Sequence, residues 1–162
     1  MSGFFLMTLS IFLFVTRSFC SFGANAAQQS IKTSITNHKK IPFTIRRANK
    51  EDIPGINQIN LDNLPENYSH YFYLNHLEKW PELSIVAETT SNEMIGYALG
   101  RLEGNPNPIG HVASVAVNKR FRGCGVAQSL MNSLHVSFVN DYNVDSVSLY
   151  CRVSVKYDYM IM

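Results

Sequence analysis

The feature that most constrains this chain is a junction at which an apolar strand runs through a glycine-containing turn directly into a helix. The strand is the small-apolar run His111–Val117, and the turn closes with Arg122, Gly123, Cys124 and Gly125. The first N–H groups of a helix have no intrahelical acceptor and carry partial positive charge. The glycines let an anion approach the backbone, and the arginine adds a permanent cation. The junction therefore predicts a site for a phosphate or pyrophosphate group.

Two well-known nucleotide motifs do not fit this turn. A Walker A loop ends in Gly-Lys-Ser/Thr, whereas this chain reads Gly-Val-Ala at that point, which excludes the P-loop hydrolases. A dinucleotide fingerprint requires a third glycine where this chain has Gln128, and an acid after the next strand, whereas Asp145 precedes that strand. The structural alternative is a glycine turn that only admits the helix. Arg122 and the order of elements argue against that alternative.

The periodicity of apolar residues predicts one α+β domain. Alternation at period two indicates strands, and spacing of three or four indicates helices. The continuous run at His111–Val117 is typical of a buried central strand, with His111 on the same face as Ala113, Val115 and Val117. We expect a strand at Phe43–Arg47, helices from Asn49 to Leu64 and from Tyr68 to Trp80, strands at Ser84–Glu88, Met94–Leu102 and His111–Val117, a helix through Ala127–Phe138 and a strand at Val144–Val153. This β-α-α-β-β-β-α-β order predicts a mixed central sheet flanked by helices.

Residues 1–41 form a leader that we expect to lie outside the fold. Its apolar run Gly3–Val15 is shorter than the ~20 residues of a membrane-spanning helix. It has the length of a signal-peptide core, and Ala24-Asn25-Ala26 supplies a cleavage pattern, although no Lys or Arg precedes the run. The leader is thus either a targeting signal or an upstream extension of the gene model. A cytoplasmic location is favoured, and a secretory or organellar one applies if the leader is a true signal.

Charge and cysteine content exclude several classes of protein. Residues 1–50 contain seven Lys/Arg and no acid, whereas residues 51–162 contain seven Lys/Arg and twelve acids. A mildly acidic domain behind a basic leader does not fit a nucleic-acid-binding fold. The three cysteines, Cys20, Cys124 and Cys151, form no CxxC pair, which excludes a disulfide scaffold and a structural zinc site.

The turn and several other segments resemble one enzyme superfamily. Residues 122–127 (RGCGVA) match the Arg-x-x-Gly-x-Gly/Ala pattern of the GNAT acetyltransferases, between the same strand and helix. The segment 63–68 (NLPENY) is similar to the first peptide-binding loop of N-terminal acetyltransferases of the NatA catalytic type and their archaeal counterparts. The same holds for WPEL at 80–83, IGY at 95–97, GHV at 110–112, NDYN at 140–143 and RVS at 152–154. The resemblance covers roughly residues 43–154 and implies a GNAT-like acyltransferase fold.

The resemblance also implies a co-substrate, acetyl-CoA, and no metal. In the family the pyrophosphate of CoA lies on the turn, and the pantetheine arm lies along the preceding strand. The matching positions here are Val115, Ala116, Val117, Arg122, Gly123, Cys124, Gly125, Val126 and Ala127.

The function implied is transfer of an acetyl group to the α-amino group of protein N-termini. Such a transfer needs a base to take a proton from the amine. Glu66 is the first candidate, although a surface acid or a helix cap would have the same pattern, and His111 is the second, although a lone histidine on an apolar strand is often only a core residue. The substrate-binding positions implied are Leu64, Pro65, Glu66, Tyr68 and Arg152.

Two alternatives remain open at this point, namely an acetyltransferase acting on small-molecule amines and a non-catalytic CoA-binding or interaction module. The second is favoured by the tail at residues 155–162, which departs from the family pattern. By the resemblance, a C-terminal helix and the last two strands would be missing. The partners implied are protein or peptide N-termini, an auxiliary helical-repeat subunit and, through it, ribosomes, without direct binding of nucleic acid.

Overall fold

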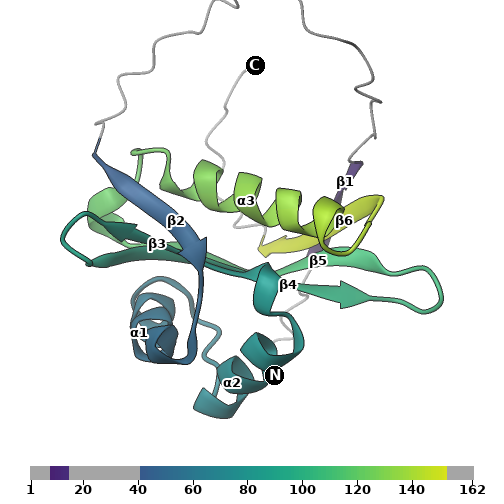
Figure 1. Cartoon of the computed structure of the whole chain (residues 1–162), viewed down its shortest axis with the longest axis horizontal. Helices are drawn as coiled ribbons and strands as arrows, with labels where there is room; N and C mark the ends of the chain where they lie inside the picture. Colours follow the sequence, from purple (N-terminus) through teal and green to yellow (C-terminus); the bar gives the residue numbers. More distant parts are fainter. Residues whose placement is uncertain (1–7, 15–40, 153–162) are drawn as a thin grey trace, which may run out of the picture.

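The computed structural model describes residues 8–14 and 41–152 of the chain, the side chains of 8–14, 151 and 152 excepted. These residues form one mixed sheet between two layers of helix (Figure 1). The prediction of an α+β fold with a mixed sheet flanked by helices is confirmed. From residue 42 onwards the order of the longer elements is also the one expected from the sequence.

The described residues contribute six strands to the sheet, in the order β1-β6-β5-β4-β3-β2. Only the pair β5–β6 is parallel, and the other neighbours are antiparallel. The strands are β1 (Thr8–Phe14), β2 (Phe43–Arg47), β3 (Ser84–Thr89), β4 (Met94–Glu103), β5 (Ile109–Val117) and β6 (Ser146–Arg152).

The helices lie on both faces of the sheet. Helices α1 (Ile53–Asn63) and α2 (His70–Lys79) cover one face, and α3 (Val126–Asn140) covers the other (Figure 1). Each layer has its own apolar core, because the two faces of β3, β4 and β5 bury different residues. Three short 3₁₀ helices, η1 (Lys50–Asp52), η2 (Pro81–Leu83) and η3 (Lys119–Phe121), precede α1, β3 and the glycine turn.

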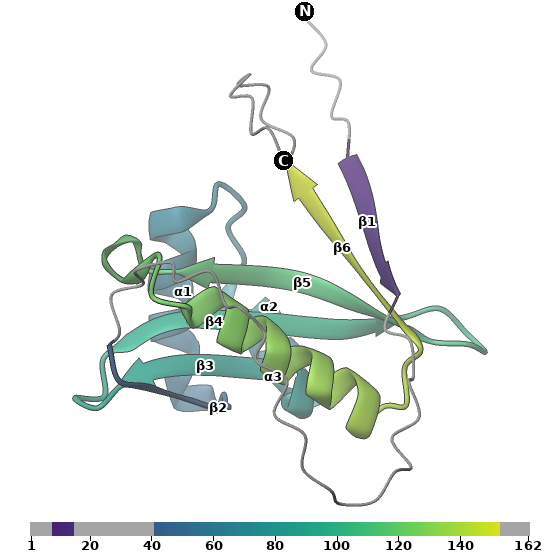
Figure 2. The ribbon, with the colours of Figure 1, turned by 90° about the horizontal axis from the view of Figure 1, so that it is seen from above.

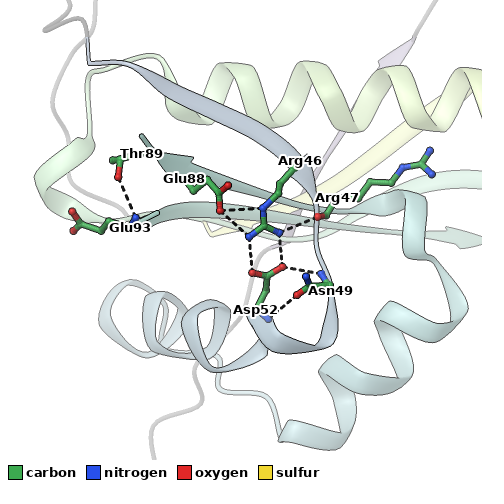
Figure 3. A network of polar contacts seen from close by, with 7 residues as sticks. All are labelled: Arg46, Arg47, Asn49, Asp52, Glu88, Thr89 and Glu93. Atoms are coloured by element: carbon green, nitrogen blue, oxygen red, sulfur yellow. Dashed lines mark hydrogen bonds and ion pairs between the residues drawn. The ribbon is translucent and has the colours of Figure 1, made fainter. Parts of the chain in front are cut away.

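An ion network fixes the start of α1 against the sheet (Figure 3). The guanidinium of Arg46 in β2 donates to both carboxylate oxygens of Asp52, at 2.7 and 2.8 Å, and to Glu88 in β3 at 2.8 and 3.0 Å. Asp52 and Asn49 also form a capping box, in which each side chain accepts from the other's backbone N–H. Since Asp52 is the N-cap of α1, this network fixes where the helix begins.

The strand β1 differs from our expectation that residues 1–41 lie outside the fold. Thr8–Phe14 pairs antiparallel with β6, from Thr8 opposite Arg152 to Phe14 opposite Ser146 (Figure 2). Without this strand, β6 would present a row of unpaired N–H and C=O groups at the edge of the described sheet. A short apolar stretch of the leader satisfies those groups.

A β-bulge in β5 overturns one expectation about His111. Leu99 of β4 lies opposite Ser114, and the next residue, Gly100, lies opposite Val112, so Ala113 is an extra residue in β5. After the bulge, Val115 and Val117 pack on the α3 side, as Val112 does before it. His111 alternates with Val112 and faces α1 and α2. The expectation that His111 shares a face with Val115 and Val117 is therefore wrong.

Strands β5 and β6 separate just where the bulge lies. They pair only from Gly110 opposite Val147 to Val112 opposite Leu149, and then diverge (Figure 2). Beyond Val112, the side of β5 that faces away from β4 has no partner strand among the described residues. We call the space between the diverging strands the strand split.

Residues 153–162 lie outside the described residues, so the expectation of a missing C-terminal helix and two missing strands stays a prediction. Arg152 ends β6, and its side chain is also outside the description. In the described ranges no helix combines the length and apolar character needed to cross a membrane.

Candidate active site

A pocket of about 560 Å³ opens where the end of β5, the glycine turn and the start of α3 meet. Eight of the nine positions implied for CoA line it, and the ninth, Cys124, does not. The wall also includes residues that the sequence did not single out for CoA. The lining is Asn63, Leu64, Val115, Ala116, Val117, Phe121, Arg122, Gly123, Gly125, Val126, Ala127 and Gln128.

The two glycines of the turn have backbone conformations that L-residues rarely adopt. Gly123 has φ +73° and Gly125 has φ +82°, and a side chain at either would meet open space rather than protein. Glycine is therefore required by the backbone rather than by crowding. Gly125 is the N-cap of α3, and no side chain caps the helix. The amide N–H groups of the first helical turn thus remain for a ligand.

Arg122 lines the pocket, and although the residue is exposed, two hydrogen bonds hold its guanidinium in place. Its Nη2 donates to the side-chain carbonyl of Asn63 at 2.7 Å, and its Nε donates to the backbone carbonyl of Val117 at 3.4 Å. One guanidinium therefore links the end of α1 to the end of β5. The cation, the uncapped helix and the unpartnered edge of β5 together fit a long ligand with a charged pyrophosphate and an extended amide-containing arm, as CoA has.

Cys124 lies apart from this chemistry. It is half-buried, and its Sγ contacts the carbonyl of Arg122 at 3.7 Å. Among the described residues there is no group of three or more His, Cys, Asp or Glu side chains that could hold a metal ion.

His111 is buried at the start of the strand split, with 3% of its surface exposed. Its Nδ1 lies 2.9 Å from Oγ of Ser148 in β6 and 3.9 Å from a carboxylate oxygen of Glu103 in β4. The ring of Tyr150 stacks obliquely on the imidazole, with centroids 4.8 Å apart. Burial lowers the pKa of His111 below the ordinary histidine value, with Glu103 opposing this shift and Arg101 adding to it. The imidazole is therefore neutral at pH 7.

The predicted substrate loop joins α1 to α2 beside the pocket. Leu64 lines the pocket directly. Pro65 and Glu66 are exposed, and Tyr68 is half-buried. The Tyr68 ring stacks on Phe72 of α2 at 4.2 Å between centroids, which fixes the far end of the loop. The roles proposed for these side chains remain predictions.

Several residues near the site were missed from the sequence. Asn63 and Gln128 line the pocket, yet Gln128 drew attention only because it is not glycine. Ser148 and Glu103 carried no signal, since only the pairing of β6 and β4 with β5 brings them to His111. Behind them, Asn60 of α1 donates to the Tyr97 hydroxyl, which in turn bonds Ser114 at the bulge.

Comparisons with known proteins agree with this geometry. Residues 53–156 match the acetyltransferase (GNAT) family. The N-terminal acetyltransferase A complex catalytic subunit ard1 of Schizosaccharomyces pombe is 39% identical over 113 residues, which cover 68% of this chain and 64% of that protein. An N-alpha-acetyltransferase of the archaeon Saccharolobus solfataricus is 36% identical over 121 residues, which cover 69% of this chain and 72% of that protein.

A solved structure shows the same fold. It is Naa20 of Chaetomium thermophilum in complex with a bisubstrate analogue, with a TM-score of 0.62, 30% identity, and coverage of 69% of this chain and 64% of that one. This chain spans less than two thirds of the length of the fission-yeast relative. On the family match and the archaeal similarity, the chain belongs to the GNAT acetyltransferase family.

Proposed function

We propose that this chain transfers an acetyl group from acetyl-CoA to the α-amino group of protein N-termini. The observation that carries this proposal is that one strand, β5, lines the pocket at its C-terminal end and holds buried, neutral His111 where its pairing with β6 ends. The similar proteins named as N-alpha-acetyltransferases support the choice of substrate.

The residues of the pocket divide into a charged end and an apolar end. Arg122 and the first-turn amides of α3 suit the pyrophosphate of CoA. The unpartnered edge of Val115, Ala116 and Val117 suits the amides of the pantetheine arm, by adding backbone hydrogen bonds along β5. When bound, acetyl-CoA supplies an acetyl group activated as a thioester.

The amine must lose a proton before or as it attacks. A peptide α-amine has a pKa of about 8, so at neutral pH most of it is protonated. The sequence favoured Glu66 as the base, and the structure shows it exposed on the loop, whereas His111 is buried and neutral at the split. We assign the proton acceptor to His111. We propose that the Glu66 carboxylate attracts and holds the positively charged amine as the peptide enters the site.

The partners follow from the relatives rather than from the geometry. One relative is named as the catalytic subunit of an N-terminal acetyltransferase complex. By that similarity we propose that this chain binds an auxiliary helical-repeat subunit and, through it, ribosomes. We also propose that the chain acts in the cytoplasm.

The test uses the full chain, acetyl-CoA and two peptides of one sequence. One peptide has a free α-amine, and the other has a blocked α-amine and a free lysine side chain. We expect mass spectrometry to show one added acetyl group on the first peptide only. Acetylation of a small polyamine instead of either peptide would support the small-molecule alternative. Binding of acetyl-CoA without any transfer would support the non-catalytic module.

A further inference from the structure

Nitrogen Nδ1 of His111 faces a hydroxyl and a carboxylate, and both can accept a hydrogen bond. Ser148 Oγ lies 2.9 Å away, and Glu103 Oε2 lies 3.9 Å away on the neighbouring strand. The two acceptors come from opposite neighbours of β5, because His111 pairs with Ser148 of β6 in register and Glu103 lies near the end of β4. Arg101 holds the Glu103 carboxylate from its far side, with Nε donating at 2.9 Å.

The hydroxyl of Ser148 has one proton, and a second contact uses it. Ser148 Oγ donates to the backbone carbonyl of Gly110 at 3.3 Å, and a carbonyl can only accept. Toward His111 the hydroxyl is then left with its lone pairs. With the hydroxyl proton on the Gly110 carbonyl, Ser148 accepts from His111, and Nδ1 is the nitrogen that carries the proton.

The other nitrogen, Nε2, is left with its lone pair. In the described part of the chain no hydrogen bond to Nε2 of His111 is present, and this atom is not among the fully buried polar atoms that lack a partner. Nε2 of His76 is such an atom and is sealed inside the core. Nε2 of His111 is therefore less completely enclosed than Nε2 of His76.

We infer that Ser148, with Glu103, holds His111 as the Nδ1–H tautomer, so that Nε2 is the atom that takes the proton of the incoming amine. This inference rests on the proposed acetyl transfer. As the amine nitrogen bonds to the acetyl carbon, its proton moves to Nε2, and the C–S electron pair leaves with sulfur, which takes a proton from solvent. Ser148 is a positioning residue, because it acts through the imidazole and touches no reacting atom.

The tautomer is unusual enough to test directly. A histidine side chain in water favours the Nε2–H form, so an Nδ1–H form measured in this protein would need a cause in the surroundings of His111. The groups that face the imidazole are Ser148, Glu103, Arg101 and the Tyr150 ring. Of these, only Ser148 and Glu103 can accept a hydrogen bond from Nδ1.

The experiment is long-range ¹H–¹⁵N correlation of the full chain labelled at histidine, above pH 7, with His111 assigned by the signals that disappear in His111→Phe. We expect protonated Nδ1 and unprotonated Nε2 in the wild type. In Ser148→Ala the Nε2–H form should rise, and Ser148→Thr, which keeps the hydroxyl, should restore the wild-type pattern. Ser146→Ala, two residues earlier on the same strand, is the matched control and should change nothing.

Activity gives a second readout. Ser148→Ala should lower kcat roughly three- to tenfold, the effect of one lost hydrogen bond, with KM for the peptide unchanged. An Nε2–H wild type, or a tautomer that Ser148→Ala leaves unchanged, overturns the inference. Neither spectrum depends on turnover, so a chain that shows Nδ1–H and transfers no acetyl group contradicts the proposed function alone.

Discussion

Two buried histidines of the described residues, His76 of helix α2 and His111 of strand β5, have different surroundings. Both are almost fully buried, at 2% and 3% exposure, and burial is the largest cause lowering the pKa of each. His76 of α2 lies between the Phe72 and Trp80 rings and bonds the backbone of Gly100. His111 has side-chain acceptors on one nitrogen and the strand split beyond the other.

The difference between the two surroundings is the reason that we propose His111, and not His76, as the base. Burial alone makes both side chains neutral, so a lowered pKa does not identify the base. A base must also have a lone pair that the substrate can reach. In a buried strand, this requires that the neighbouring strand diverge beside the side chain. The bulge at Ala113 and the end of β5–β6 pairing at Val112 provide this at His111. Helix α2 continues past His76 without a break.

The largest expected effect is the loss of turnover in His111→Phe. A well-placed general base contributes about 10²–10⁴-fold, so kcat should fall by that factor while acetyl-CoA affinity is retained. His76→Phe, the matched variant in α2, should keep kcat within about twofold of the wild type. Steady-state rates against one N-terminal peptide measure both. Equal losses of kcat in His111→Phe and His76→Phe would show that both substitutions act by destabilising the fold, and not by removing a base.

The same pair of histidines predicts an acid-sensitive fold. The pKa of His76 is lowered to about 4 by burial, whereas the unfolded side chain titrates near 6.5. Between these values the unfolded chain binds a proton that the folded chain does not, so stability falls as pH falls. From about pH 7.5 to about pH 5 this amounts to about 2 kcal/mol.

Urea unfolding of the wild type and His76→Leu at both pH values isolates this contribution. The variant cannot titrate at position 76, so its loss of stability on acidification should be smaller by that amount. His111 and His135 also have lowered pKa values and titrate in both proteins, so the difference belongs to His76. Identical pH dependence in the two proteins would mean that folding does not lower the pKa of His76.

A third prediction separates the pocket from the histidine. Arg122→Ala removes a charged donor from the mouth, and acetyl-CoA affinity should weaken by about 1.5–3 kcal/mol, roughly ten- to a hundredfold in Kd. The control is Arg120→Ala, because Arg120 is exposed, pairs with Glu93 and does not line the pocket. Calorimetry measures both. Unchanged affinity in Arg122→Ala would contradict the proposal that Arg122 binds the pyrophosphate of CoA. It would not affect the proposed difference between His111 and His76.

The contrast between the histidines also marks the limit of sequence reasoning. Helix α1, with isoleucines at spacing three, and the β3–β4 hairpin follow from local periodicity, and the glycine turn follows from residue chemistry alone. The β-bulge leaves no pattern, because an extra residue at Ala113 looks the same as an unbroken strand. The neighbours of His111 come from pairings that join residues far apart in sequence, as does the strand at Thr8–Phe14.

The smallest effect is expected for Glu66→Gln. This variant tests whether Glu66 only binds the amine or acts as the base in place of His111. If Glu66 holds the charged amine, the amide loses the charge attraction, and KM should rise roughly three- to tenfold with kcat nearly unchanged. The midpoint of the rise of kcat with pH should lie below the ordinary histidine pKa of about 6.5 in both proteins, because burial lowers the pKa of His111. The value of kcat/KM should keep rising toward pH 8 as the free amine loses its proton. Rates across about pH 5.5–9 measure all three quantities. A fall in kcat of about 10²-fold or more with KM unchanged would make Glu66 the base and return His111 to the class of His76.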